Sequence, residues 1–308
     1  MKLAAYKING KKRVGIVPTD FESKILDVSY LTGGDSGTVS LIQNVNAFSE
    51  IKELEQRISH DESLQNKLID RQSVTSLPPI ERPGKIVCLA GNYRAHITES
   101  GYVAPEERAN FTQQLFLKPS TSLTGNGSVI ELGEQNVRVG WEAELAVIIG
   151  KRGKNIRLED AFDYVFGYTI LNDLSERGLN SRIENRHLRE MDGFCDWLAG
   201  KWFDGFAPCG PWIVTEDEIA DPHDLEIKFY LNGKLRQHGS TKEMIFSIPE
   251  QIAYISSIMT LEPGDIISTG TPAGAGLGDK KTSLSDGDEF VSEIEGIGRL
   301  TNKVRWAD

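Results

Sequence analysis

The stretch Trp141–Gly150, with the sequence WEAELAVIIG, places two carboxylates at the start of a run of apolar residues. β-Branched and aliphatic residues in such a run are typical of a strand. Side chains alternate between the faces of a strand, so Glu142 and Glu144 point the same way. At roughly 3.3 Å of rise per residue their Cα atoms lie about 6 to 7 Å apart, a gap that two oxygens can close around one hard cation. The alternative is a solvated sheet face.

A third carboxylate, Asp173, follows the apolar run Val165–Leu171. We expect it at the end of a strand, where a loop begins. An all-oxygen set with open positions suits magnesium or manganese better than zinc, which prefers imidazole and thiolate. The sequence therefore predicts a divalent metal held by Glu142, Glu144 and Asp173.

Composition narrows the function classes. The chain has 308 residues and a net charge of −11, and this charge argues against a nucleic-acid surface. We find neither an apolar stretch of signal-peptide length at the N-terminus nor a run that approaches a membrane span, so we expect a cytoplasmic protein without a membrane partner. The three cysteines, Cys88, Cys195 and Cys209, are far apart and form no Cys-x-x-Cys, and we expect buried, reduced thiols.

The chain is predicted to contain a small domain and a large one. Residues 3–17 alternate around Asn9 and Gly10 as in a hairpin, and Phe48–Leu68 has helix-like periodicity, which predicts a small α+β domain over residues 1–77. Ser76–Gly84 contains three prolines and is the linker candidate. The larger domain spans residues 84–308.

The larger domain is predicted to be a β-rich α+β unit. The turn at Asn232 and Gly233 predicts a hairpin, and helices are expected over Leu158–Tyr164 and over Ile248–Met259, which Ser247 introduces. The expected strands are Ile86–Leu89, Glu144–Ile149, Val165–Leu171, Trp212–Thr215, Leu225–Leu231 and Asp265–Ser268.

A histidine and a carboxylate follow the first strand of this domain. His96 and Glu99 are three residues apart and would face the same side of a helical turn. A carboxylate bonded to a histidine fixes its tautomer and raises its basicity, which suits a base that deprotonates water. The alternative is a surface His–Glu pair.

With these motifs in place, the chain resembles the fumarylacetoacetate hydrolase family, which includes acylpyruvases, 2-hydroxyhepta-2,4-diene-1,7-dioate isomerases and oxaloacetate decarboxylases. The resemblance spans about residue 84 to the C-terminus. It implies a β-roll catalytic domain, which is unique to the family and usually dimeric. The motifs that carry it, in chain order, are NYxxHxxE at 92–99, EAELAV at 142–147, FGYT at 166–169, NDLSxR at 172–177, GKWFDGF at 200–206, MIFSIPE at 244–250, LEPGD at 261–265 and GTPAG at 270–274.

The resemblance also implies roles for individual residues. Glu142, Glu144 and Asp173 match the metal ligands, for magnesium, manganese or calcium. His96 and Glu99 match a water-activating dyad on a lid, and Lys201 matches a catalytic lysine near the metal. Substrate contacts are implied at Tyr93, Arg177, Asn180 and Thr271.

The chain departs from the family pattern between Asp173 and Lys201. Asn180 stands where many members carry glutamine, and the segment Asn180–Leu198 is longer than in compact members. Three arginines in it, at helical spacing and beside His187, could bind a distal carboxylate of a substrate. The alternative is a solvated helix paired with Glu184 and Glu190. These arginines are Arg182, Arg186 and Arg189, and the histidines given no role are His60, His223 and His238.

The leading hypothesis is a metal-dependent hydrolase that cleaves a carbon–carbon bond in a β-diketo acid such as an acylpyruvate. Glu99-supported His96 deprotonates water, hydroxide attacks the distal carbonyl, and the metal holds the departing enolate while Lys201 adds positive charge. The alternatives are an oxaloacetate-type decarboxylase, an isomerase of an unsaturated 2-oxo diacid, and a member that binds its ligand without turnover. The expected partners are a small 2-oxo acid and a second copy of the chain in a homodimer.

Overall fold

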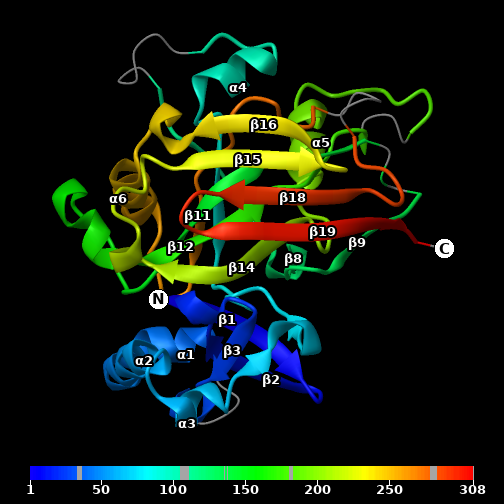
Figure 1. Ribbon diagram of the computed structural model, residues 1–308. Helices are drawn as coiled ribbons and strands as arrows, with labels where there is room; N and C mark the ends of the chain where they lie inside the picture. The colour runs from blue at the N-terminus through cyan, green and yellow to red at the C-terminus, as the bar shows by residue number, and fades with distance from the viewer. Residues whose placement is uncertain are drawn as a thin grey trace.

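The computed structural model describes residues 1–32, 37–104, 111–134, 136, 138–179, 183–277 and 283–307. Two β-sheets pack against each other in the larger part of the molecule, and helices of the N-terminal region lie below them in Figure 1. The fold is α+β and rich in strands, as the sequence predicts. None of the helices in the described part of the chain is long and apolar enough to cross a membrane.

The N-terminal region begins with the predicted hairpin of β1 (Lys2–Ile8) and β2 (Lys11–Ile16). Asn9 and Gly10 have φ values of 50° and 77°, the left-handed conformation that a two-residue hairpin turn requires. The helical pattern over 48–68 forms two helices rather than one, because Asp61 caps a new helix after the first ends. The remaining elements here are β3 (Lys24–Asp27), α1 (Thr38–Gln43), α2 (Val45–Ile58), α3 (Glu62–Gln65), β4 (Ile69–Asp70) and β5 (Thr75–Ser76).

The larger sheet runs without interruption from this region into the rest of the molecule. Its strand order is β4-β3-β2-β1-β14-β12-β11-β17-β6-β7, with β5 paired to β1 and β8 to β14. Lys2 of β1 pairs with Val214 and Leu3 with Ile213, so the N-terminal hairpin extends the sheet directly. The further strands are β6 (Ile86–Ala90), β7 (Gln114–Lys118), β8 (Leu123–Thr124), β11 (Ala143–Ile149), β12 (Val165–Asn172), β14 (Ala207–Thr215) and β17 (Ile266–Ser268).

The smaller sheet covers one face of the larger one (Figure 1). Its hairpin turns at Asn232 and Gly233, whose φ values of 50° and 74° repeat those of the first hairpin. Trp141 stacks on Phe229 of this sheet with ring centroids 5.0 Å apart, within the core between the sheets. Its strand order is β16 (Lys234–Ser240), β15 (Glu226–Leu231), β18 (Glu289–Ile294), β19 (Gly298–Trp306) and β9 (Val129–Leu132).

Side chains of β11 point alternately into two hydrophobic cores. Leu145 and Val147 pack between the sheets, whereas Ala146 and Ile148 belong to a second core on the opposite face, with Phe116. Glu144 has the parity of this second group. The acidic side chains therefore face away from the smaller sheet.

The helices of the larger domain are α4 (Arg94–Glu99), α5 (Asp192–Ala199) and α6 (Ile248–Ile258). The predicted start of α6 is confirmed, because Ser247 and Glu250 form a capping box and proline stands in the first turn. Leu158–Tyr164 is a 3₁₀ helix, not an α-helix. Cys88 and Cys209 are buried as predicted, but Cys195 is exposed, because it lies on the solvent side of α5.

Candidate metal centre

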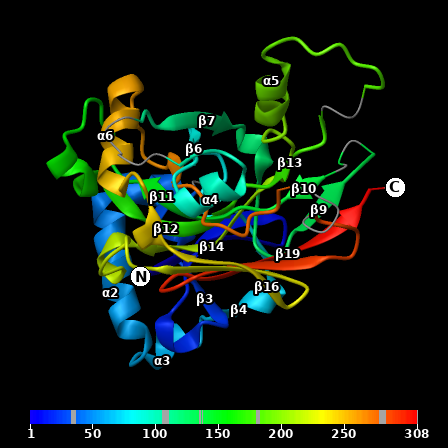
Figure 2. The same cartoon turned by 90° about the horizontal axis from the view of Figure 1, so that it is seen from above.

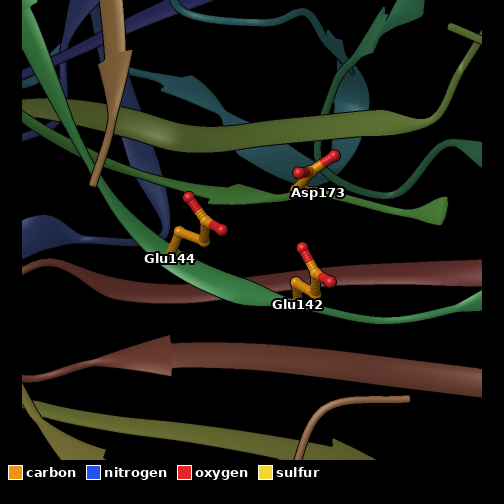
Figure 3. A group of neighbouring side chains, drawn as sticks. All are labelled: Glu142, Glu144 and Asp173. Carbon is orange, nitrogen blue, oxygen red and sulfur yellow. The ribbon is translucent and has the colours of Figure 1, made fainter. Parts of the chain in front are cut away.

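Three carboxylates converge at one end of β11 and β12. Glu142 immediately precedes β11, Glu144 is its second residue, and Asp173 follows the last residue of β12. One ligand oxygen from each lies within 4.8 Å of the others, and all three residues are buried. Figure 3 shows Glu142 and Glu144 extending from the same side of one strand toward Asp173 on its neighbour.

Backbone hydrogen bonds hold the two strand ends in register. The N–H of Asp173 donates to the carbonyl of Glu142 over 2.8 Å. Glu144 accepts from the Ser268 hydroxyl at 2.6 Å and from the N–H of Gly270 at 2.9 Å. Gly270 has a φ of +92°, and an added Cβ would lie 2.8 Å from that of Asn92, so a larger residue would disturb this contact.

Two buried lysines neutralise the cluster. Lys201 donates from Nζ to Glu142 at 2.8 Å and to Asp173 at 2.7 Å. Lys118, at the end of β7, donates to the other oxygen of Asp173 at 2.7 Å and to the carbonyl of Leu174 at 3.1 Å. Both side chains are almost wholly buried, and each oxygen of Asp173 therefore binds an ammonium group.

Sequence reasoning missed Lys118. A usable signal was present, because Phe116 and Lys118 have the same parity in an apolar strand. A lysine at an inward position of a strand requires a buried anion. Asp173 meets that requirement.

The two glutamates differ in pKa. Burial raises the pKa of Glu144 well above its usual range, and the charges of Asp173 and Glu142 raise it further. Burial also acts on Glu142, but Lys201 and Arg177 outweigh it and hold the pKa of that carboxyl far below its usual range. Burial lowers the pKa of Lys201, and Asp173 and Glu142 reverse this effect, so the ammonium stays charged.

This donor set fits a divalent cation. The ligand atoms are all carboxylate oxygens, the type that magnesium, manganese and calcium prefer. They are already within 4.8 Å of one another in a buried site. Burial first, and the charges of Asp173 and Glu142 second, raise the pKa of Glu144, and a bound cation would favour its ionised form.

The predicted dyad lies on α4. His96 Nδ1 and Glu99 are 3.7 Å apart, which is an electrostatic contact and not a hydrogen bond. Glu99 instead accepts the N–H of Gly274 at 2.8 Å, while Nδ1 of His96 is buried with no hydrogen-bond partner among the described residues. Burial lowers the pKa of His96 more than Glu142 raises it, so the imidazole is neutral at pH 7.

Of the predicted substrate contacts, Arg177 lies against the carboxylate cluster. Its Nη2 donates to Glu142, and its Nε donates to the carbonyl of Gly276 at 2.8 Å. The Thr271 hydroxyl donates to the carbonyl of Ala143 at 2.8 Å and so anchors its loop between the two glutamates.

Tyr93 is held differently from these two contacts. Tyr93 is fully buried, and its hydroxyl has no hydrogen-bond partner within the described ranges. Burial raises the pKa of its phenol. Asn180 lies outside the described residues.

The solvated helix that is one of the two alternatives for this segment is not found over residues 183–191, which form turns and irregular chain. Arg186 pairs with Asp196 at 2.6 Å, and Arg189 pairs with Asp192 at 2.9 Å. Neither Glu184 nor Glu190 is the partner, because the loop folds back onto α5. Arg182 lies outside the described residues, and His187 is exposed.

The fold is β-rich and buries three carboxylates and two lysines at the end of a strand pair, an arrangement that could hold a divalent cation. The family model for the fumarylacetoacetate (FAA) hydrolase C-terminal domain matches residues 85–305. The chain therefore belongs to the fumarylacetoacetate hydrolase family, whose fold the sequence predicted.

Three relatives illustrate its range. An uncharacterised protein of Pyrococcus abyssi is 51% identical over 72% of this chain and 91% of its own length. The human mitochondrial oxaloacetate tautomerase is 40% identical over 77% of this chain and 71% of its own. The crystal structure of maleylpyruvate hydrolase from Sphingobium sp., in complex with manganese(II) and pyruvate, is 31% identical, covers both chains fully and superimposes with a TM-score of 0.78.

Proposed function

We propose that this protein is a divalent-metal-dependent enzyme that transfers a proton on a small 2-oxo acid, converting the keto and enol forms of an oxaloacetate-like diacid. The observation that carries the proposal is the buried cluster of Glu142, Glu144 and Asp173 with Lys201 against it. The human relative with 40% identity is an oxaloacetate tautomerase, and this supports the choice of reaction.

Different residues of the site have different parts in this reaction. Magnesium or manganese bound by the three carboxylates would supply Lewis-acid polarisation of the substrate's 2-oxo group. Lys201 and Arg177 place positive charge beside Glu142, where they favour negative charge developing on a substrate oxygen. Neutral His96 takes the proton from the carbon next to the carbonyl and delivers it to the carbonyl oxygen, which gives the enol, and the reverse transfer restores the keto form. Lys118 holds Asp173 in place.

A second candidate is hydrolysis of an acylpyruvate-like substrate, the leading hypothesis from sequence. The structural similarity to a maleylpyruvate hydrolase favours it. The same His96 would then act on water, with Glu99 beside it. Hydrolysis releases a second acid, decarboxylation releases carbon dioxide, and tautomerisation releases neither, so product analysis separates the three.

The test follows the ultraviolet absorbance of enol-oxaloacetate in protein loaded with magnesium or manganese. We expect the wild type to accelerate loss of the enol without release of carbon dioxide, and His96→Gln and Lys201→Met to lose most of the acceleration. Glu289→Gln, at an exposed position of β18, is the matched control and should behave as the wild type.

Two outcomes contradict the proposal. Metal-loaded protein that leaves the interconversion at its background rate excludes the tautomerase. Release of pyruvate from an acylpyruvate, together with an unchanged enol decay, assigns the hydrolase instead.

The oligomeric state and the cellular compartment of the protein stay predictions. We propose a homodimer, to be checked by light scattering of the purified chain. The cytoplasm is the compartment we infer from the sequence, whereas the human relative is mitochondrial by name, so imaging of the tagged protein decides between them.

A further inference from the structure

An aromatic surface lies against the active-site lysine. Nζ of Lys201 is 5.0 Å from the ring centroid of Phe116 on β7 and 5.6 Å from that of Trp197 on α5. The two rings meet edge to face, with centroids 5.1 Å apart and an interplanar angle of 73°. A cation above aromatic faces is attracted by their electron density, and more strongly where water is excluded.

The ammonium group of Lys201 therefore has a charged side and an apolar side. Glu142 and Asp173 accept hydrogen bonds from the ammonium group on one side. Trp197 and Phe116 bring apolar surface to the other. Because ammonium groups are strongly hydrated, this surface keeps water from the third N–H and holds the group against the carboxylates.

Trp197 is incompletely packed on its own side. A cavity of about 120 Å³ borders it, and Arg177 and Asp196 also line this cavity. The ring of Phe194 stacks at 5.8 Å, but Phe194 is itself 54% exposed. Apolar packing alone therefore does not fix the position of Trp197.

An arginine in the preceding segment supplies the missing restraint. Arg186 donates to Asp196 at 2.6 Å and lies 3.4 Å from Asp192, and both aspartates belong to α5. Asp196 is the residue next to Trp197. Figure 2 shows α5 and the segment before it on the side of the larger sheet away from the smaller one.

We propose that Trp197 is a positioning residue for Lys201 and that Arg186, through Asp196, holds Trp197 in place. The inference rests on the proposed function only where it gives Lys201 a part in turnover. Arg186 and Arg189 thus act within the protein, on α5, instead of binding a distal carboxylate of the substrate.

The kinetic test compares Trp197→Leu with Trp197→Phe, using Lys201→Met as the reference for loss of the ammonium group. A displaced catalytic group costs up to about 100-fold in rate, so we expect kcat of Trp197→Leu to fall between about tenfold and 100-fold, with KM changed less than about threefold. Trp197→Phe keeps an aromatic face and should recover most of the rate. The melting temperature of each variant reports any loss of folding.

A second readout needs neither metal nor turnover. Metal-free protein is treated with acetic anhydride, and acetylation of individual lysines is followed by peptide mass spectrometry. Lys201 should be protected in the wild type and in Trp197→Phe, and should react severalfold faster in Trp197→Leu and in Arg186→Met. Lys303, with 67% of its side chain exposed, is the reactive control, and Lys118 should stay protected unless the whole site opens.

The outcomes separate this inference from the proposed function. If Lys201→Met loses turnover while Trp197→Leu keeps both turnover and lysine protection, the positioning role is wrong and the proposed function stands. If Lys201→Met keeps turnover, the proposed function is wrong, and the acetylation rates still decide the role of Trp197. Additive effects of Arg186→Met and Trp197→Leu in the double variant would contradict the restraint by Arg186.

Discussion

Two regions border Lys201 and are built differently. The strand pair β11 and β12 presents carboxylates that are buried and held by backbone hydrogen bonds. Residues 183–199 expose large apolar side chains. Ion pairs of Arg186 and Arg189 hold the part before α5 to that helix. The strand pair fixes the charges of the site, and by our proposal residues 183–199, the covering segment, limit how much water reaches Lys201. The exposed side chains are Ile183, Leu188, Met191 and Phe194.

The difference implies unequal sensitivity to substitution. Strands hold a precise arrangement of functional side chains well, whereas segments with few buried contacts open at low free-energy cost. We expect changes in the strand pair to alter metal binding and stability together. Changes in the covering segment should alter turnover with little effect on stability.

The largest effect is expected for Asp173→Asn. The substitution removes the anion that pairs with both Lys118 and Lys201, and breaking a buried ion pair costs about 3–5 kcal/mol. The free energy of unfolding of the metal-free protein, measured with urea, should fall by about this amount, and turnover should be lost. Unchanged stability would show that the lysines are not paired with Asp173 in solution.

The substitution Glu144→Gln tests the strand pair in a second way. Because burial and the charges of Asp173 and Glu142 raise the pKa of Glu144 well above its usual range, the metal-free site favours the protonated carboxyl, and a neutral amide replaces it at little cost. We expect stability of the metal-free protein to change by less than about 1 kcal/mol, while manganese affinity falls about 100-fold or more. Calorimetric titration with manganese measures the second effect. Wild-type affinity in this variant would remove Glu144 from the ligand set.

The pH profile tests the lid residue His96. Burial lowers its pKa below the ordinary 6.5, so the base form persists to lower pH than for an exposed histidine. The acidic limb of kcat/KM should therefore lie below pH 6.5, with activity lost as the pH falls through the lowered pKa. An acidic limb above pH 6.5 that persists in His96→Gln would show that another group causes it.

The smallest effect is expected for Arg189→Ala in the covering segment. The Arg189 side chain is 87% exposed, and exposed ion pairs contribute little. Turnover should stay within about twofold of the wild type, in contrast to Arg186→Met. Equal losses in both variants would show that the segment acts through its net charge and not through the contact with Asp196.

Short-range patterns in the sequence predicted the parts of the site that strands organise. Alternation placed Glu142 and Glu144 on one side, and the end of an apolar run placed Asp173 beside them. Both inferences need only the periodicity of a strand and the pairing of two neighbours. The turns at Asn9 and Asn232 followed from local chemistry in the same way.

Contacts that depend on sheet order or on loop folding could not be read from the sequence. Lys118 bonds to Asp173 although three strands, β11, β17 and β6, lie between β7 and β12 in the sheet order, and residue spacing does not encode such a contact. The charge spacing around Arg186 matches a helix, but the same spacing also serves a loop that folds back on a following helix. Periodicity does not distinguish these cases.

The pairing of β1 with β14 has a consequence for how the molecule is made. Leu3 finds its partner Ile213 only after most of the chain has left the ribosome, so the hairpin of β1 and β2 must wait with one edge open. Such distant pairing slows folding and leaves a strand edge available to other chains. We therefore expect nascent fragments that end before β14 to gain more than the full-length protein from chaperones that shield β-edges during synthesis.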